Sequence, residues 1–180
     1  RNTAVRAIDN IRDTAMSHER NFLIEVMGRA TGFLAVDVGL AVGAEVILLP
    51  EYPLTLDELV GKLTSKRREK LTSIIVSAEA EKSGRSFQLA EDIERQSGIE
   101  YKVCVLGHIQ RGGSPTVRDR LVGAMMGAKA IEIFLAGQTN KMVAMHGDDL
   151  CAVDFSDESH AVRYFNRPEL LEINDILCDI

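Results

Sequence analysis

The sequence predicts an α/β fold in which helices pack on a parallel β-sheet. Short apolar runs of strand length alternate with helical patterns of about ten residues or more. Glycine, proline or a capping residue stands at most of the boundaries between them. This alternation implies βαβ units with right-handed crossovers. With 180 residues, of which 46% are hydrophobic, the chain can form one good-sized core or two small lobes.

The first half of the chain contains the alternating elements. Residues 1–16 have apolar side chains at helical spacing and no capping residue before them, which suggests a longer protein cut inside a helix. Strands are expected at residues 22–26, 46–49, 73–77 and 103–106. Helices are expected at 33–42, 56–66 and 87–96, with Thr55 and Glu58 as a capping box, Ser86 as a cap, and Gly43 and Gly98 as stops.

The pattern changes after Pro115. A long helix is expected from Thr116 to Ala136, capped by Thr116 with Asp119 and ended by Gly137. Residues 141–145 and 150–153 indicate a β-hairpin. Ser156 is expected to cap a further helical stretch that breaks before Pro168, and a short helix follows that proline.

Composition and charge exclude several classes of protein. The net charge of -6 and the pI near 5.3 argue against a nucleic-acid binder, which would carry a basic face. No apolar run reaches the length of a membrane span, and the first residues contain no signal-peptide core. Three cysteines, with Cys104 inside an apolar run, suggest reduced thiols in a cytoplasmic protein.

Three expected strands end in polar residues, at Met27-Gly28-Arg29, at Glu79 and at His108–Gly113. Each has a plainer interpretation: a strand-to-helix turn with a surface arginine, a solvated loop carboxylate, and a tight turn with a helix cap. The last interpretation accounts for the glycines and Pro115 but not for His108 or Arg111.

Ligands bind at the carboxyl ends of the strands in open α/β sheets. Taken together, the three ends offer arginines for a phosphate, a carboxylate for hydroxyl groups, and backbone amides at a helix start. The residues therefore indicate a site for a phosphorylated polyol, and they do not name the sugar.

Four segments resemble bacterial 6-phosphofructokinase. They are Ser17–Arg20 (SHER), Ile24–Arg29 (IEVMGR), Gly43–Glu45 (GAE) and Val105–Pro115 (VLGHIQRGGSP). The likeness runs in order from residue 1 to about residue 154. It implies a three-layer, Rossmann-like phosphofructokinase fold, incomplete in this chain. It also implies an allosteric, homotetrameric glycolytic enzyme that transfers the γ-phosphoryl of ATP, with Mg²⁺, to the 1-hydroxyl of fructose 6-phosphate, giving fructose 1,6-bisphosphate.

The resemblance assigns roles to individual residues. It places fructose 6-phosphate against Met27, Gly28, Arg29, Glu79, His108 and Arg111, and Arg29 also stabilises charge on the transferring phosphoryl group. Arg20 matches an arginine that reaches the active site of a neighbouring subunit. The family's second arginine of that kind aligns with Lys102, which keeps the charge but lacks the bidentate fork.

The resemblance also implies an effector site between subunits for ADP or phosphoenolpyruvate. Arg12 and Glu45 match effector residues, with Glu45 as the ligand of the effector's magnesium ion. Arg68 and Lys70 lie near the family's basic effector loop, although this chain is one residue shorter there. A solvated helix end explains that basic cluster equally well.

Parts of the family's machinery are expected outside this chain. The glycine-rich ATP loop and the catalytic aspartate lie upstream of Arg1 in the family. Residues 1–109 and 160–180 are expected to form the lobe for fructose 6-phosphate and effector, and residues 110–159 to belong to the missing ATP-binding lobe. We therefore expect the 180 residues alone to be inactive, with apolar residues exposed on the helix at 116–136 (Leu121, Val122, Met125, Ile131, Phe134 and Leu135).

Two alternatives stay open at this point. One is a pyrophosphate-dependent phosphofructokinase, because the residues that select the donor lie in the missing half. The other is a non-catalytic domain that binds a sugar phosphate. A glycine-rich loop and an aspartate pair upstream would establish the enzyme.

Overall fold

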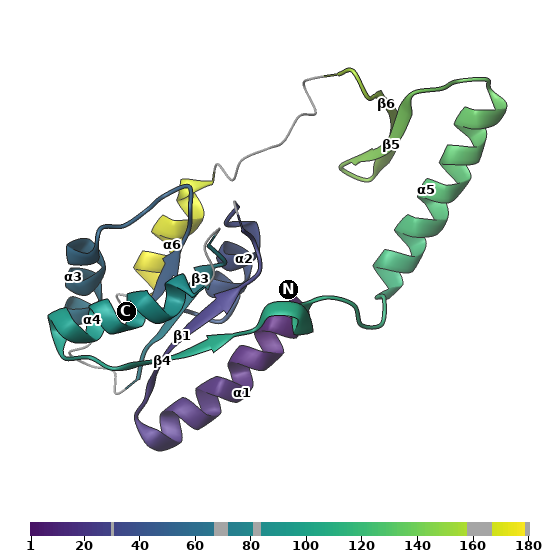
Figure 1. The fold of residues 1–180 in the computed structure, drawn as a ribbon. Coiled ribbons are helices and arrows are strands. Elements are labelled where there is room, and N and C mark those ends of the chain that lie inside the picture. Colours follow the sequence, from purple (N-terminus) through teal and green to yellow (C-terminus); the bar gives the residue numbers. More distant parts are fainter. Residues whose placement is uncertain (30, 67–71, 81–83, 158–166, 179–180) are drawn as a thin grey trace. The chain divides into compact units, whose positions relative to one another are not determined.

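A computed structural model describes the chain except for residues 30, 67–71, 81–83, 158–166 and 179–180 (Figure 1). The chain divides into two compact units. The first contains Arg1–Arg111 and Tyr164–Ile180, and the second contains Gly112–Arg163. Each unit is described by itself below.

The first unit is built on a parallel four-stranded sheet with strand order β2-β3-β1-β4. Its strands are β1 (Asn21–Val26), β2 (Val46–Leu48), β3 (Ile74–Ala78) and β4 (Tyr101–Val105). Its helices are α1 (Asn2–His18), α2 (Phe33–Ala41), α3 (Leu56–Lys66), α4 (Arg85–Ser97), the 3-10 helix η1 (Gly107–Gln110) and α6 (Pro168–Cys178). The predicted α/β class is confirmed, and the predicted elements lie within a few residues of the observed ones.

The sheet has an apolar core on each of its two faces. On one face, Ile24 and Val76 pack with side chains of α1, α2 and α6, among them Ile8 and Val36. On the other face, Leu23 and Ile75 pack with side chains of α3 and α4. Adjacent residues of one strand enter different cores because side chains alternate across a sheet. The result is the three-layer arrangement expected of parallel strands buried on both faces.

Helix α2 lies unusually close to the edge strand β2. A Cβ atom built on Gly39 would stand 2.6 Å from Cγ1 of Ile47, so only glycine fits at this contact. This close approach sets the position of α2, whose first residue follows the connection from β1.

The helix caps were predicted with mixed success. The Thr55 amide donates to Oε2 of Glu58 at 2.8 Å and the Glu58 amide donates to Oγ1 of Thr55 at 3.3 Å, which confirms the first capping box. The prediction that Ser86 caps α4 was wrong. Gly84, with φ +85°, precedes that helix, while Ser86 lies inside it, buried, and its hydroxyl donates to Glu25 on β1.

The described part of the second unit contains one helix and one hairpin. Helix α5 (Val117–Leu135) carries the predicted Thr116–Asp119 capping box, and β5 (Lys141–His146) pairs antiparallel with β6 (Asp149–Asp154). Gly147, with φ +65°, lies in the turn between the strands. The helical stretch expected after Ser156 lies largely in residues outside the described part of the chain.

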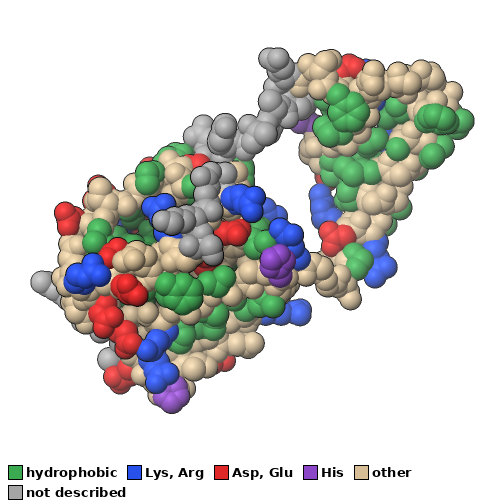
Figure 2. All heavy atoms as spheres, in the orientation of Figure 1, with side chains coloured by type: hydrophobic (Ala, Val, Ile, Leu, Met, Phe, Trp, Pro, Cys, Tyr) green, Lys and Arg blue, Asp and Glu red, His purple; other side chains and the backbone are tan. Residues whose placement is uncertain are grey.

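Several apolar side chains lie exposed on the face of this second unit that Figure 2 shows. On α5, Leu121, Met125, Ile131, Phe134 and Leu135 are exposed as expected, with Leu135 at 78%. Val122 is the exception, because it is half-buried. None of the helices in the described part of the chain is long and apolar enough to cross a bilayer.

Candidate functional site

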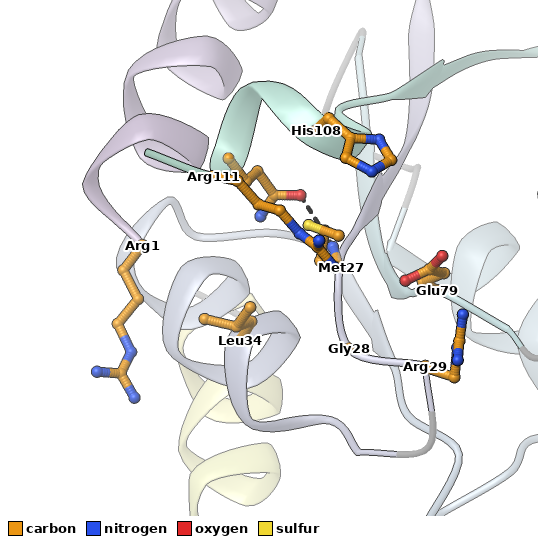
Figure 3. A pocket seen from close by; sticks show the side chains of 9 residues that line it. Arg1, Met27, Gly28, Arg29, Leu34, Glu79, His108 and Arg111 are labelled. Atoms are coloured by element: carbon orange, nitrogen blue, oxygen red, sulfur yellow. Dashed lines mark hydrogen bonds between the residues drawn. The ribbon is translucent and has the colours of Figure 1, made fainter. Parts of the chain in front are cut away.

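The carboxyl ends of β1, β3 and β4 open into a cavity of about 600 Å³ (Figure 3). It is lined by Arg1, Met27, Gly28, Arg29, Leu34, Glu79, His108, Gln110 and Arg111. All the substrate residues that were predicted at strand ends are in this set. The structure therefore brings the three strand ends together in one site.

Backbone hydrogen bonds align these strand ends. The Glu79 amide donates to the carbonyl of Val26 at 2.7 Å, and the Leu106 amide donates to the carbonyl of Glu25 at 3.0 Å. Both bonds continue the parallel ladders by which β1 pairs with β3 and with β4. Because β1 lies between its two partners, the residues that follow all three strands emerge side by side.

The connection after β1 makes a tight turn at the cavity wall. The Thr31 amide donates to the carbonyl of Gly28 at 3.0 Å, and a Cβ atom on Gly28 would stand 2.5 Å from the Thr31 oxygen. Arg29 has a left-handed backbone conformation with φ +46°, which is uncommon outside glycine. In Figure 3 its side chain extends toward Glu79.

The chain turns sharply after β4 and brings two basic residues to the cavity. Gly107, with φ +50°, starts η1, and the Arg111 amide closes it by donating to the carbonyl of His108 at 3.0 Å. The side chains of His108 and Arg111 are exposed. With Arg29 they outnumber Glu79, which is the one carboxylate among the described residues that line the cavity. This balance favours an anionic ligand that also carries hydroxyl groups.

Three lining residues were not predicted: Arg1, Leu34 and Gln110. Arg1 forms an ion pair with Asp37 on α2. The Oε1 atom of Gln110 accepts a hydrogen bond of 2.9 Å from the Met27 amide. The only sequence signal for Gln110 is its place between His108 and Arg111, since an amide side chain follows no periodic pattern.

Arg20 and Lys102 lie at the opposite end of the sheet. Arg20 directly precedes β1, and Lys102 is the register partner of Phe22 near the start of β4. A strand of this length separates them from the cavity by roughly 15–20 Å. Lys102 forms an ion pair with Glu100 that lowers the pKa of Glu100, and Arg20 lowers that pKa further. Neither residue lines the cavity.

Two of the predicted effector residues, Arg12 and Glu45, lie near the amino end of β2. Arg12 donates through Nη2 to the carbonyl oxygens of Val42 and Gly43. Glu45 is only 4% exposed, and its Oε2 atom accepts a hydrogen bond of 2.7 Å from the Ile74 amide. Arg68 and Lys70 lie outside the described residues.

No cluster of three or more His, Cys, Asp or Glu side chains suited to a metal ion occurs in the described part of the chain. Glu45 therefore belongs to no such cluster among these residues. A magnesium ion held by Glu45 would take further oxygen ligands from other groups, such as a bound phosphate or water.

Comparison with known proteins identifies the family. The sequence matches the phosphofructokinase family over residues 1–134. The chain belongs to the phosphofructokinase family. The predicted resemblance is confirmed by curated relatives from bacteria that are named ATP-dependent 6-phosphofructokinase.

Two of these relatives show how far the likeness extends. The Coxiella burnetii enzyme is 52% identical over 177 residues, which cover 98% of this chain and 54% of the relative. A Thermus thermophilus enzyme is 52% identical over 180 residues, which cover 98% of this chain and 55% of the relative. The chain thus spans about half the length of the curated phosphofructokinases that it matches.

Solved structures support the fold. Phosphofructokinase from Saccharomyces cerevisiae superposes with a TM-score of 0.74 at 30% identity, over 84% of this chain and 22% of the yeast chain. The pyrophosphate-dependent enzyme from Marinobacter aquaeolei superposes with a TM-score of 0.75 at 20% identity, over 96% of this chain and 54% of that chain. At that lower identity the likeness shows the fold alone.

Proposed function

We propose that the chain is the sugar-phosphate-binding part of an ATP-dependent 6-phosphofructokinase. The whole enzyme would transfer the γ-phosphoryl of ATP to the 1-hydroxyl of fructose 6-phosphate and release fructose 1,6-bisphosphate. The observation that carries this proposal is the cavity at the carboxyl ends of β1, β3 and β4, which collects Arg29, Glu79, His108 and Arg111.

Each residue has a distinct task in this proposal. Arg111 and His108 donate hydrogen bonds to the 6-phosphate, and the guanidinium of Arg111 adds charge to its bonds. Glu79 accepts hydrogen bonds from sugar hydroxyls. Arg29 stabilises negative charge on the phosphoryl group during transfer, since catalysis of phosphoryl transfer rests on positioning and charge stabilisation.

The division of labour between lobes follows from the same proposal. Residues 1–109 and 160–180 form the lobe for sugar phosphate and effector, and residues 110–159 belong to the ATP-binding lobe. The division of the chain into two compact units near residue 111 supports this assignment. The donor loop, the catalytic base and the magnesium ion that accompanies ATP belong to the other half, so we expect no turnover from the 180 residues alone.

A shared site between subunits would explain the amino end of the sheet. Arg20 and Lys102 would reach the 6-phosphate in a neighbouring subunit of a cytoplasmic homotetramer. Arg12, Glu45, Arg68 and Lys70 would contact ADP or phosphoenolpyruvate. Glu45 would contribute one carboxylate to a magnesium ion whose other ligands include the effector's phosphates.

The donor is ATP rather than pyrophosphate in this proposal. The curated relatives that are 44–52% identical to this chain are named ATP-dependent 6-phosphofructokinase, and the match spans about half of each relative's length. The pyrophosphate-dependent structure shares the fold at only 20% identity, so it does not favour that donor.

Calorimetry on the 180-residue chain tests the acceptor site. We expect fructose 6-phosphate to bind, and unphosphorylated fructose to bind much more weakly because the charged contacts are lost. Fructose binding as tightly as its phosphate would contradict the assignment.

A chimera tests the reaction. In it, the chain replaces the matching part of the Coxiella burnetii enzyme, and turnover is measured with fructose 6-phosphate and either Mg-ATP or Mg-pyrophosphate. We expect turnover with ATP, and none from the 180-residue chain alone. Because the donor half of the chimera comes from the Coxiella burnetii enzyme, the chimera tests the acceptor role of this chain, and a folded chimera without turnover would contradict that role.

A further inference from the structure

The backbone amide of Met27 lies just beyond the last rung of the sheet. That last rung is the bond from the Leu106 amide to the Glu25 carbonyl at 3.0 Å. Beyond it, β4 ends and the chain curls at Gly107 into η1, where the Leu106 carbonyl accepts from the Ile109 amide at 3.4 Å. The Met27 amide, which directly follows β1, therefore has no carbonyl group of β4 to which it can donate a hydrogen bond.

Gln110 takes the place of that missing strand carbonyl. Its Oε1 atom accepts from the Met27 amide at 2.9 Å, a bond drawn in Figure 3. The side chain thereby extends the β1–β4 ladder by one bond and ties Met27 to the segment that carries His108 and Arg111. A partly buried backbone amide is stabilised by such a partner, and here a side chain supplies it.

A second side chain, that of Glu51, holds the end of the β1–α2 connection that leads into α2. The Gly32 amide, at the start of α2, donates to Oε1 of Glu51 at 2.9 Å. Glu51 follows β2 and Pro50. A Cβ atom on Gly32 would stand 2.6 Å from Cδ2 of Leu49 and 2.9 Å from Oε2 of Glu51, so the two segments are in close contact.

Packing alone does not account for polar side chains at these two positions. Nε2 of Gln110 and Oε2 of Glu51 are buried and have no hydrogen-bond partner among the described residues. A buried polar atom without a partner destabilises the fold, and an apolar side chain of similar length would avoid that loss. The hydrogen bonds that Oε1 of Gln110 and Oε1 of Glu51 accept from backbone amides therefore explain why these two positions carry polar side chains.

The two bonds enclose the strained residue of the site. Arg29 lies between Met27 and Gly32 in sequence and has φ +46°. A left-handed arginine persists only where the surrounding structure holds it, and strain of this kind is concentrated at binding and catalytic sites. Freeing either end would let the backbone of Arg29 relax and move its side chain away from Glu79.

We propose that Gln110 and Glu51 are positioning residues that clamp Met27 and Gly32 and so hold Arg29 in place in the cavity. They act through the backbone of the connection and need no contact with reacting atoms. The proposal rests on the proposed function for the identity of the ligand, fructose 6-phosphate.

Amide hydrogen exchange tests the clamp on the 180-residue chain. Gln110→Met removes the acceptor at nearly constant volume, so we expect exchange of the Met27 amide to accelerate on the order of tenfold or more. Gln110→Glu retains an acceptor oxygen at the same reach and should keep exchange within about twofold of the parent. Gln88→Met is the matched control, because Gln88 is exposed on α4 and its side chain bonds to Asp92 in the same helix.

Glu51 provides an independent test, in which a conservative substitution keeps the acceptor atom. Glu51→Met should accelerate exchange of the Gly32 amide by a similar factor, and Glu51→Gln, which keeps Oε1, should not. Glu91→Met on the exposed side of α4 is the control. If Gln110→Met fails to fold, Gln110→Asn, which is one methylene too short to reach Met27, replaces it.

Binding separates positioning from a purely structural role. We expect Gln110→Met and Glu51→Met to lower the affinity for fructose 6-phosphate about tenfold, which corresponds to the loss of about one hydrogen bond. Glu51→Gln should keep that affinity within about twofold. In the chimera, the KM for fructose 6-phosphate should rise by the same factor while the KM for ATP stays constant.

The outcomes are distinct. Unchanged Met27 exchange in Gln110→Met would show that the bond does not restrain this amide and would overturn the clamp. Faster exchange of the Met27 and Gly32 amides with unchanged affinity for fructose 6-phosphate would show that both residues stabilise the fold only, and would overturn the proposal. If the unmodified 180-residue chain binds no fructose 6-phosphate, the proposed function is wrong. Amide exchange and the binding of inorganic phosphate would then still test whether Gln110 and Glu51 hold the connection in place.

Discussion

The two ends of the parallel sheet differ in how they use charged residues. At the carboxyl end, residues from three strands converge on one cavity, and Arg29, His108 and Arg111 line it (Figure 3). At the amino end, Lys102 is paired with Glu100 and Glu45 bonds the Ile74 amide. The charged residues at the carboxyl end are thus gathered around one cavity, whereas these groups at the amino end already have partners within the chain.

This difference has a topological origin. The carboxyl ends of parallel strands feed loops that fan out over a common edge, so their side chains can converge. At the amino ends, Glu45, just before β2, accepts a hydrogen bond from the Ile74 amide of β3, and Lys102 pairs with Glu100 at the start of β4. The proposed assembly would add a surface from another subunit at this end.

The largest effect is expected from Arg111→Ala at the carboxyl end. Losing a charged hydrogen bond to phosphate should weaken fructose 6-phosphate by about 1.5–3 kcal/mol, because the lost bond involves a guanidinium. Calorimetry on the chain measures the loss, and Arg95→Ala, an exposed arginine of α4 paired with Asp92, is the control. In the chimera, an equal loss of ATP affinity would argue against a sugar-phosphate role.

Glu45→Ala should act on stability at the amino end. The sequence alone is compatible with an exposed carboxylate there, but the buried Oε2 atom bonds the Ile74 amide. Leaving that amide without a partner should lower the free energy of unfolding by about 1–3 kcal/mol. Glu45→Gln, which keeps an acceptor, should lose less. Urea denaturation compares both with the exposed Glu94→Ala, and equal stability of all three would place Glu45 among ordinary surface residues.

Lys102 is expected to show a contrast between the isolated chain and the assembled enzyme. In the 180-residue chain, Lys102→Ala should change fructose 6-phosphate affinity less than about twofold, because the residue lies far from the cavity and exposed ion pairs contribute little. In the chimera, Lys102→Ala should weaken that affinity and Lys102→Arg should keep or tighten it. No change in either setting would make Lys102 a surface residue without a role in binding.

The smallest effect concerns acid titration of Glu100. Its pKa lies below the ordinary value because of the hydrogen bond and charge of Lys102, with a further contribution from Arg20. The associated stabilisation is present above the ordinary carboxyl pKa and is lost as the pH falls through the lowered one. Lys102→Ala should shift the pKa of Glu100 back upward in a carbon-detected NMR titration. Glu58, whose pKa is lowered by Thr55, should titrate unchanged.

The elements that the sequence predicted well are those with local signals. The strands are continuous apolar runs, and both capping boxes consist of residues three positions apart, such as Thr116 and Asp119. The site residues at the carboxyl ends were predictable for a similar reason, since parallel strands place their ends at one edge.

The features that sequence reasoning missed depend on partners distant in the chain. Ser86 was assigned to a cap, but its hydroxyl bonds Glu25, which no local pattern reveals. Gln110 and Glu51 bond backbone amides of Met27 and Gly32 from other connections. A single polar side chain in a loop gives no indication of which amide it will reach once the strands have assembled.

The strand order also has a consequence for synthesis on the ribosome. β1 is the strand that carries Met27 to the cavity, yet both of its neighbours, β3 and β4, come much later in the chain. The edge groups of β1 therefore stay without strand partners until the ribosome has released the residues up to Ala78, and one side remains open until Val105 follows. During that interval an apolar segment with free amides and carbonyls is available to wrong partners. The central place of β1, which brings residues to the cavity in the finished protein, therefore lengthens the time for which the nascent chain is exposed to wrong pairing.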